Sequence, residues 1–121
     1  RDWSSDVCSS DLPFLRRSSR PRIITISSQM GSFARNSPGS VAYRTSKSAV
    51  NKAMQLLALE FQSDKIVVCP VHPGWVQTDM GGVGAEITVE ESADSLFRLV
   101  DRLTLNDSGR FFTWDGREHP W

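Results

Sequence analysis

Tyr43 and Lys47 are the two residues of this sequence whose types and spacing are best suited to chemistry. They are four positions apart, so on an α-helix they would lie on one face, one turn from each other. An ammonium group beside a phenol favours the ionised phenolate, and such a pair can give and take a proton. A pair of this kind also arises by chance on solvated helices, so the surrounding sequence must decide between the two readings.

A strand and a loop are predicted immediately before this pair. Ile23 to Ser27 is short and rich in β-branched residues, which indicates a buried strand. Gly31 to Ser40 is rich in Gly, Ser, Asn and Pro and predicts a loop, whereas Val41 to Gln62 lacks Gly and Pro and predicts a long helix. Ser28 therefore falls beyond the carboxyl end of a strand, where open α/β sheets bind ligands. Its hydroxyl could bind a reacting oxygen, or it could simply satisfy loop backbone.

A second strand is predicted after the long helix, from Lys65 to Val71, and a third from Arg110 to Trp114. Two strands joined by one helix form a βαβ crossover, which implies parallel strands. The turn at Pro73 and Gly74 then lies at the same edge of the sheet as Ser28. We interpret the intervening His72 as a turn residue that the following proline holds extended.

Two helices of the predicted fold have apolar faces that must be covered. A capping box of Thr88 and Glu91 begins the second helix. Its predicted apolar face comprises Ala93, Leu96, Phe97, Val100 and Leu103. The long helix has one apolar face with Val50, Met54, Leu57 and Phe61, and another with Ala49, Ala53 and Leu56. We expect the first face to pack on the sheet and the second to pack on another subunit.

Composition and charge exclude several classes of protein. Lys plus Arg and Asp plus Glu number 14 each, so there is no net charge to attract nucleic acid or an anionic membrane. No run of about eighteen apolar residues could span a bilayer. Cys8 and Cys69 do not suggest a disulfide framework, and His72 and His119 beside them do not suggest a metal site. We expect a cytoplasmic protein that binds no metal.

Three segments, in order along the chain, carry a family resemblance. They are Ile26-Ser27-Ser28-x-x-Gly31, Tyr43-Arg44-Thr45-Ser46-Lys47, and the ten residues from Val71 to Met80. Together they resemble the C-terminal half of a short-chain dehydrogenase/reductase, from about Pro13 to Trp121. The tail from Asp107 to Trp121 is most similar to the branch of C-factor and carbonyl-reductase-like members. The resemblance implies an α/β fold, the C-terminal half of a Rossmann-type doubly wound parallel sheet.

The resemblance also implies an activity and a set of site residues. Members of this family are NAD(P)-dependent oxidoreductases that transfer hydride between nicotinamide and a carbonyl or alcohol. By residue-by-residue match, Tyr43 would be the general acid/base, Lys47 would support it and bind the nicotinamide ribose, and Ser28 would orient the substrate carbonyl. The residues expected to line the nicotinamide are Pro73, Gly74, Val76 and Thr78. The partners implied are a small carbonyl or alcohol substrate and, in the intact parent, further copies of the chain; NAD and NADP both remain open.

The sequence also departs from the family. It contains no Gly-rich phosphate-binding turn and no Asn-Ala-Gly segment, and it offers three strand candidates where a full dinucleotide fold has about six. Residues 1–12 resemble translated sequencing-adapter read-through, with a natural disordered leader as the alternative. Residues 13–121 would then be a partial domain, the catalytic half without the phosphate-binding half. We therefore expect an oxidoreductase parent and an inactive fragment; the alternative is a non-catalytic fragment or a C-factor-like signalling or interaction protein.

Overall fold

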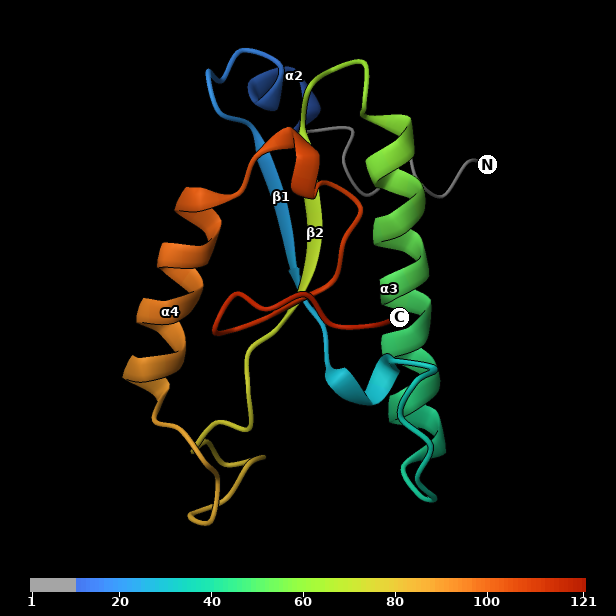
Figure 1. The fold of residues 1–121 in the computed structure, drawn as a ribbon, viewed down its shortest axis with the longest axis vertical. Helices are drawn as coiled ribbons and strands as arrows, with labels where there is room; N and C mark the ends of the chain where they lie inside the picture. The colour runs from blue at the N-terminus through green and yellow to red at the C-terminus, as the bar shows by residue number, and fades with distance from the viewer. Residues whose placement is uncertain (1–10) are drawn as a thin grey trace.

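A three-stranded sheet lies between two long helices in the computed structural model, which describes residues 11–121 (Figure 1). The strands are all parallel and follow the order β1-β2-β3. The elements are α2 (Leu12–Leu15), β1 (Arg22–Ile26), η1 (Gln29–Gly31), α3 (Val41–Glu60), β2 (Val67–His72), α4 (Val89–Arg102), η2 (Leu105–Asp107) and β3 (Phe112–Thr113). This arrangement confirms the predicted α/β class, a partial Rossmann-type sheet.

The strands are shifted and shorter than the sequence predicts. Lys65 has a φ of 57°, which lies outside the β region, so β2 begins two residues later, at Val67. At its other end β2 extends to His72, which pairs with Thr113 of β3. The interpretation of His72 as a turn residue was therefore wrong. β3 keeps only two residues of the strand predicted from Arg110 to Trp114.

Side chains alternate between the two faces of β2 and so divide the core in two. Val68 packs with the buried face of α3, whereas Val67, Cys69 and Val71 pack with α4. On β1, Ile23 and Ile24 divide between the same two clusters. Because both faces of the sheet are covered, β2 is buried along its whole length, as its continuous apolar run requires.

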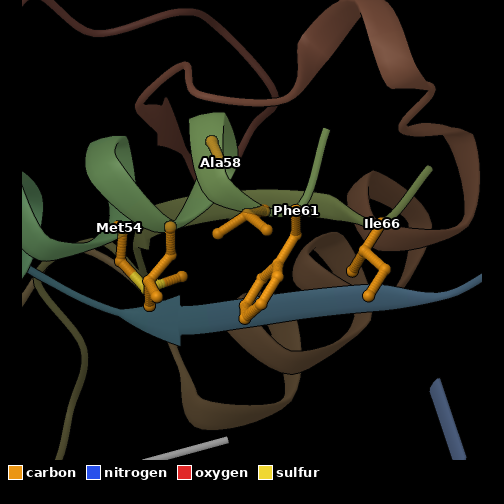
Figure 2. Packing of buried hydrophobic residues seen from close by; sticks show 6 residues of the cluster. Met54, Ala58, Phe61 and Ile66 are labelled. Atoms are coloured by element: carbon orange, nitrogen blue, oxygen red, sulfur yellow. The ribbon is translucent and has the colours of Figure 1, made fainter. Parts of the chain in front are cut away.

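The helix α3 packs on the sheet through the face that the sequence predicts. Met54, Leu57 and Phe61 are all at least nine-tenths buried, and Figure 2 shows Met54, Phe61 and Ile66 pointing toward the sheet. Leu56, on the second predicted apolar face, is 52% exposed. Among residues 11–121 nothing covers Leu56, and the packing of this face on another subunit stays a prediction.

The helix α4 begins at the predicted capping box and turns a different set of residues toward the core. The Thr88 hydroxyl accepts from the Glu91 amide, and the Glu91 carboxylate accepts from the Thr88 amide. Leu99 and Leu103 are buried, whereas Phe97 is 78% exposed. The prediction for Phe97 was wrong, because the buried stripe of α4 follows Leu96, Leu99 and Leu103 and Phe97 is rotated about 100° from it.

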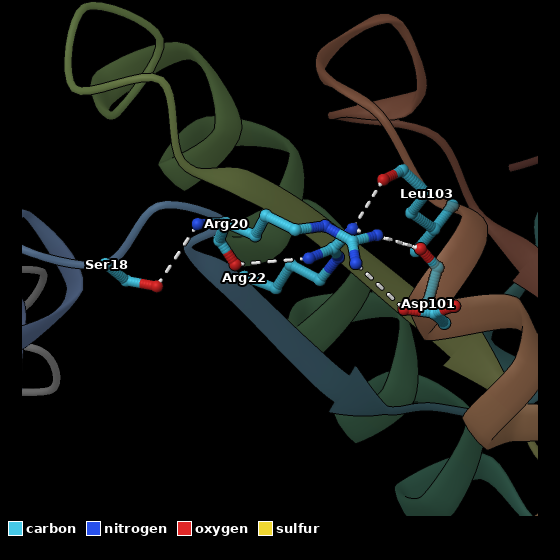
Figure 3. A network of polar contacts seen from close by, with 5 residues as sticks. All are labelled: Ser18, Arg20, Arg22, Asp101 and Leu103. Atoms are coloured by element: carbon cyan, nitrogen blue, oxygen red, sulfur yellow. Dashed lines mark hydrogen bonds and ion pairs between the residues drawn. The ribbon is translucent and has the colours of Figure 1, made fainter.

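Arginines join β1 to the C-terminal end of α4, as Figure 3 shows. Arg20 forms an ion pair with Asp101, and Arg22 donates to the main-chain carbonyls of Asp101 and Leu103 at 3.2 and 2.9 Å. The last carbonyls of a helix have no partner within the helix and carry partial negative charge. The arginines satisfy that need and hold α4 against the amino-terminal edge of the sheet.

Both ends of the described chain pack against its core. Leu12, the last residue of the predicted leader, begins α2 and packs with the cluster under α3. At the other end the Gly116 turn, with φ of 83°, sends the chain back, and Trp121 stacks on Phe111 with ring centroids 5.9 Å apart. The tail therefore returns to the core of its own chain. Between residues 11 and 121, no helix is long and apolar enough to cross a membrane.

Candidate active site

The three sequence motifs meet at the carboxyl edge of the sheet around one cavity of about 950 Å³. Ser28 follows β1, Tyr43 lies in the first turn of α3, and the turn at Pro73 and Gly74 follows β2. All of these residues line the cavity, as do Val76 and Thr78. The βαβ arrangement thus brings every predicted site residue except Lys47 to the cavity wall. Lys47 does not line the cavity, but its ammonium lies near the ring of Tyr43, which does.

Ser28 is placed so that its hydroxyl proton remains available. It is 6% exposed and serves as the N-cap of η1, where its Oγ accepts from the Met30 amide at 3.1 Å. A serine hydroxyl accepts through its lone pairs and donates one proton. Because the cap uses only the acceptor side, the hydroxyl can still donate to an oxygen inside the cavity.

Gly31 sets the distance between this serine and α3. A Cβ at this position would lie 2.6 Å from the Lys47 carbonyl carbon and 2.8 Å from the Lys47 Cβ, so only glycine allows η1 to pack so closely. The Ser48 hydroxyl then donates to the Gly31 carbonyl at 2.9 Å. The Ser-x-x-Gly spacing therefore has a packing reason: it brings Ser28 against the start of α3.

Lys47 and Tyr43 lie close together on α3. The Lys47 ammonium is 5.8 Å from the centroid of the Tyr43 ring and donates to the Ile26 carbonyl at 3.1 Å. That bond fixes the charge between the end of β1 and the tyrosine. Within residues 11–121 the Tyr43 hydroxyl has no hydrogen-bond partner, and the side chain is 36% exposed. Its phenol is thus accessible from the cavity, with a cation behind the ring.

Asn51 is a positioning residue that sequence reasoning missed. The Ser27 hydroxyl donates to the Asn51 Oδ1 at 2.5 Å, and both residues are buried. This bond ties the end of β1 to α3 directly beside Ser28. The available signal was its position one turn after Lys47, on the side of the helix that faces the sheet.

The Pro-Gly turn is fixed to the start of α4. Gly74 has a φ of 92°, and a Cβ there would lie 2.4 Å from the Ile87 Cδ1 and 2.9 Å from the Trp114 Cδ1. The Ser92 hydroxyl donates to the Pro73 carbonyl at 2.6 Å. These contacts require glycine at the second turn position and hold the turn against the cavity wall.

A short stretch after this turn completes the wall. Val76 pairs with Ile87 in an isolated parallel bridge. The Thr78 hydroxyl accepts from the Gly81 amide at 3.1 Å, and the Thr78 amide donates to the Val76 carbonyl at 2.9 Å. Val76 thus offers apolar surface and Thr78 a polar group at neighbouring points of the same wall.

His72 is a buried cavity residue whose role the sequence did not indicate. It is 8% exposed, and its Nδ1 has no partner within the described chain. Burial lowers the pKa of His72 to about 4; the charges of His119 and Arg35 add to this effect and Asp115 opposes it. The imidazole is therefore neutral at physiological pH. Its position directly before Pro73 and Gly74 was the only sequence signal for it.

Comparison with known proteins assigns the class. The family model described as short chain dehydrogenase matches residues 6–86, and the chain belongs to this family. It is 41% identical over 116 residues to C-signal of Myxococcus xanthus, an alignment that covers 95% of this chain and 70% of that protein. The resemblance predicted from the three motifs is thereby confirmed.

Solved structures agree with the assignment. Carbonyl reductase Sniffer of D. melanogaster superposes with a TM-score of 0.88 at 35% identity, over 95% of this chain and 51% of that one. The NADPH-bound carbonyl reductase from chicken fatty liver gives a TM-score of 0.86 at 30% identity, over 95% and 51%. The chain thus spans about half the length of these two reductases.

Proposed function

We propose that the parent protein of this chain is an NAD(P)-dependent oxidoreductase that transfers hydride between nicotinamide and a carbonyl or alcohol substrate. By parent protein we mean the longest in-frame product that carries Pro13 to Trp121. One observation carries the proposal: a single cavity is lined by Ser28 from the end of β1, Tyr43 from α3 and the Pro-Gly turn after β2. Family membership and the carbonyl reductases among the structural relatives support it.

The cavity wall after β2 fits the nicotinamide end of a dinucleotide. The predicted contacts are Pro73, Gly74, Val76 and Thr78, which offer an apolar surface beside a hydroxyl. A volume of about 950 Å³ is large enough for a small substrate beside a flat ring. When bound, the nicotinamide would supply or accept the hydride. The NADPH in the chicken relative supports such a cofactor, and NAD and NADP remain equal candidates.

The chain's own residues would bind the substrate oxygen and transfer its proton. Ser28 would donate its free hydroxyl proton to the substrate oxygen and so orient the carbonyl. During reduction Tyr43 would give its phenolic proton to that oxygen, and during oxidation it would take the proton back. Lys47, fixed by the Ile26 carbonyl, would stabilise the phenolate that remains and would bind the nicotinamide ribose.

We further propose that the chain as printed is inactive. Its sequence has no Gly-rich turn to bind the dinucleotide phosphates. Without that contribution, the nicotinamide wall alone would give weak cofactor binding. Tight binding of NADH or NADPH by the printed chain, measured by isothermal titration calorimetry, would contradict this.

The experiment is to re-read the source DNA across the segment 1–12, express the parent protein, and assay it. We expect oxidation of NADPH or NADH that depends on an aldehyde or ketone. A Gly-rich strand-to-helix turn in the recovered frame would provide the missing phosphate site. A frame that truly begins at Arg1, together with no turnover on a panel of aldehydes and ketones, would overturn the oxidoreductase proposal.

A second function has one specific observation in its favour. The similarity to C-signal supports a signalling or interaction protein, in which the fold acts without turnover. The two functions separate on one variant, because Tyr43→Phe would abolish a catalytic role and leave a docking role unchanged. The catalytic role is measured as NAD(P)H oxidation and the docking role as the proteins retained in a pull-down. Both measurements use the variant and the unaltered parent protein.

A further inference from the structure

The candidate active-site cavity contains one arginine that nothing in the fold uses. Its charged lining residues are Arg35, Arg44 and Glu86. Arg44 holds the loop before α3, because it donates to the Gly39 carbonyl at 3.1 Å and to the Ser37 hydroxyl. The Arg35 side chain has no hydrogen bond or ion pair with any residue between 11 and 121. Arg35 is therefore available to a ligand in a way that Arg44 is not.

The backbone that carries Arg35 is held firmly at the cavity rim. The Ser32 hydroxyl donates to the Pro120 carbonyl at 2.8 Å, and the Ala34 amide donates to the Trp121 carbonyl at 3.2 Å. The Arg35 amide itself donates to the Ser32 carbonyl at 3.2 Å. The returning C-terminal tail thus fixes the start of the loop, so the guanidinium extends from a fixed point at the cavity that Ser28 also lines.

The charge of Arg35 acts on the inside of the cavity. His72 lies at the end of β2 and also lines the cavity, and the positive charge of Arg35 contributes to the lowered pKa of its imidazole. Glu86, just before α4, also lines the cavity and forms no ion pair with Arg35 within 4.0 Å in the described chain. The Arg35 guanidinium is therefore not occupied by the carboxylate of Glu86.

We infer that Arg35 is a specificity residue that selects carbonyl substrates that also bear a carboxylate. A guanidinium is a planar fork whose parallel N–H groups match the two oxygens of a carboxylate. Ser28 and Tyr43 would hold the carbonyl oxygen while Arg35 holds the anionic end. The inference rests on the proposed function, because it names the substrate class of the same site.

The test uses two aldehydes of nearly equal shape, para-formylbenzoate and its uncharged methyl ester, with the parent protein. Arg35→Gln should lower kcat/KM for the carboxylate by about 10- to 100-fold and leave the ester within about twofold. Arg35→Lys should restore part of the loss, since it keeps the charge without the fork. Glu86→Gln is the matched control: it also changes one charge in the cavity, and it should not weaken the carboxylate substrate.

Three results would overturn the inference while leaving the oxidoreductase proposal standing. The first is equal loss on both aldehydes in Arg35→Gln, and the second is no loss on either. The third is a raised KM for NADPH with both, which would assign Arg35 to a cofactor phosphate. If the parent protein reduces neither aldehyde nor any other carbonyl compound, the proposed function fails instead. In that case NMR of the Arg35 Nε–H decides: a shift with the carboxylate but not the ester supports the inference, and no difference overturns it.

Discussion

The two edges of the sheet use their arginines in opposite ways. At the amino-terminal edge Arg16 is paired with Asp64, Arg20 with Asp101, and Arg22 with the carbonyls that end α4. Among the buried side-chain atoms of the described chain at this edge, the Arg22 Nε lacks a partner. At the carboxyl edge neither the Arg35 side chain nor the buried His72 Nδ1 has a partner among residues 11–121. The amino edge uses its charges for structure, whereas the carboxyl edge leaves polar groups unsatisfied.

The difference follows from what each edge must do. Burying a polar group without a partner costs free energy, so the buried His72 Nδ1 indicates a place where a ligand could satisfy it. Arg35 is exposed, so its guanidinium is solvated by water until a ligand replaces that water. A second cavity, of about 520 Å³, lies at the amino edge and is lined by Arg16, Arg20 and Arg22. Its arginines are already bonded to the chain. Lys65, which also lines this cavity, has no side-chain partner within residues 11–121, so it is the arginines that distinguish the two edges. An arginine in a cavity wall is therefore weak evidence of a ligand site when it is already bonded to the chain.

The largest expected effect tests the carboxyl edge directly. Tyr43→Phe removes one hydroxyl from a side chain that is 36% exposed, so the fold should be unaffected. Loss of a positioned proton donor should lower the kcat of the parent protein by about 10²- to 10⁴-fold. The assay is NAD(P)H oxidation with a carbonyl substrate, and Arg16→Gln at the amino edge is the control. Comparable activity loss in Arg16→Gln would break the distinction between the two edges.

The buried, unpartnered His72 at the same edge should make the stability of the fold depend on pH. The pKa of His72 falls from 6.5 to about 4 on folding, so its neutral form is favoured in the fold. Above about pH 6.5 this contribution to stability is fully present, and it is lost as the pH falls toward about 4. The loss should reach about 3 kcal/mol. Urea unfolding from neutral to acid pH should show a smaller loss in His72→Gln, and equal losses in both proteins would contradict this.

The next largest effect is expected on stability, from a substitution at Gly31, where η1 packs closely on α3. Gly31→Ala would push a methyl group to 2.6 Å from the Lys47 carbonyl carbon and force η1 away from α3. Overpacking of this kind costs about 1–3 kcal/mol, and it should also reduce activity by displacing Ser28. Gly84→Ala is the matched control, because a Cβ there meets nothing within 4 Å. Urea unfolding of the two variants makes the comparison, and equal stability would show that η1 can shift without cost.

The sequence predicted the helices and the position of the site better than the contacts of individual side chains. The absence of Gly and Pro from Val41 to Gln62 identified α3, and the capping box identified the start of α4 at Thr88. Motif order placed Ser28, Tyr43 and the Pro-Gly turn at one edge, where the cavity now is. These features depend on local patterns and on the rule that parallel strands share an edge, both of which can be read without coordinates.

The missed features depend on contacts between distant segments. Arg35 lies in a loop that the sequence marks only as irregular, and its rim position is set by Pro120 and Trp121 far along the chain. His72 was interpreted as a turn residue because Pro73 follows it, yet pairing with β3 extends the strand through it. For Arg35 and His72 the deciding partner is separated in sequence, so no local pattern could reveal it. Phe97 was placed on the apolar face of α4 by helical spacing, whereas the buried stripe follows Leu96, Leu99 and Leu103.

The smallest effect tests the amino edge. Arg22→Gln would remove bonds to the Asp101 and Leu103 carbonyls and leave the end of α4 to water. Because the side chain is only half-buried, we expect a loss of about 1 kcal/mol in the free energy of unfolding. Arg98→Gln, on the exposed side of α4, should change nothing and serves as the control. The kcat/KM of the parent protein should be the same in both variants. If Arg22→Gln lowered kcat/KM without lowering stability, the amino edge would have a part in catalysis, and the division between a structural edge and a ligand edge would fail.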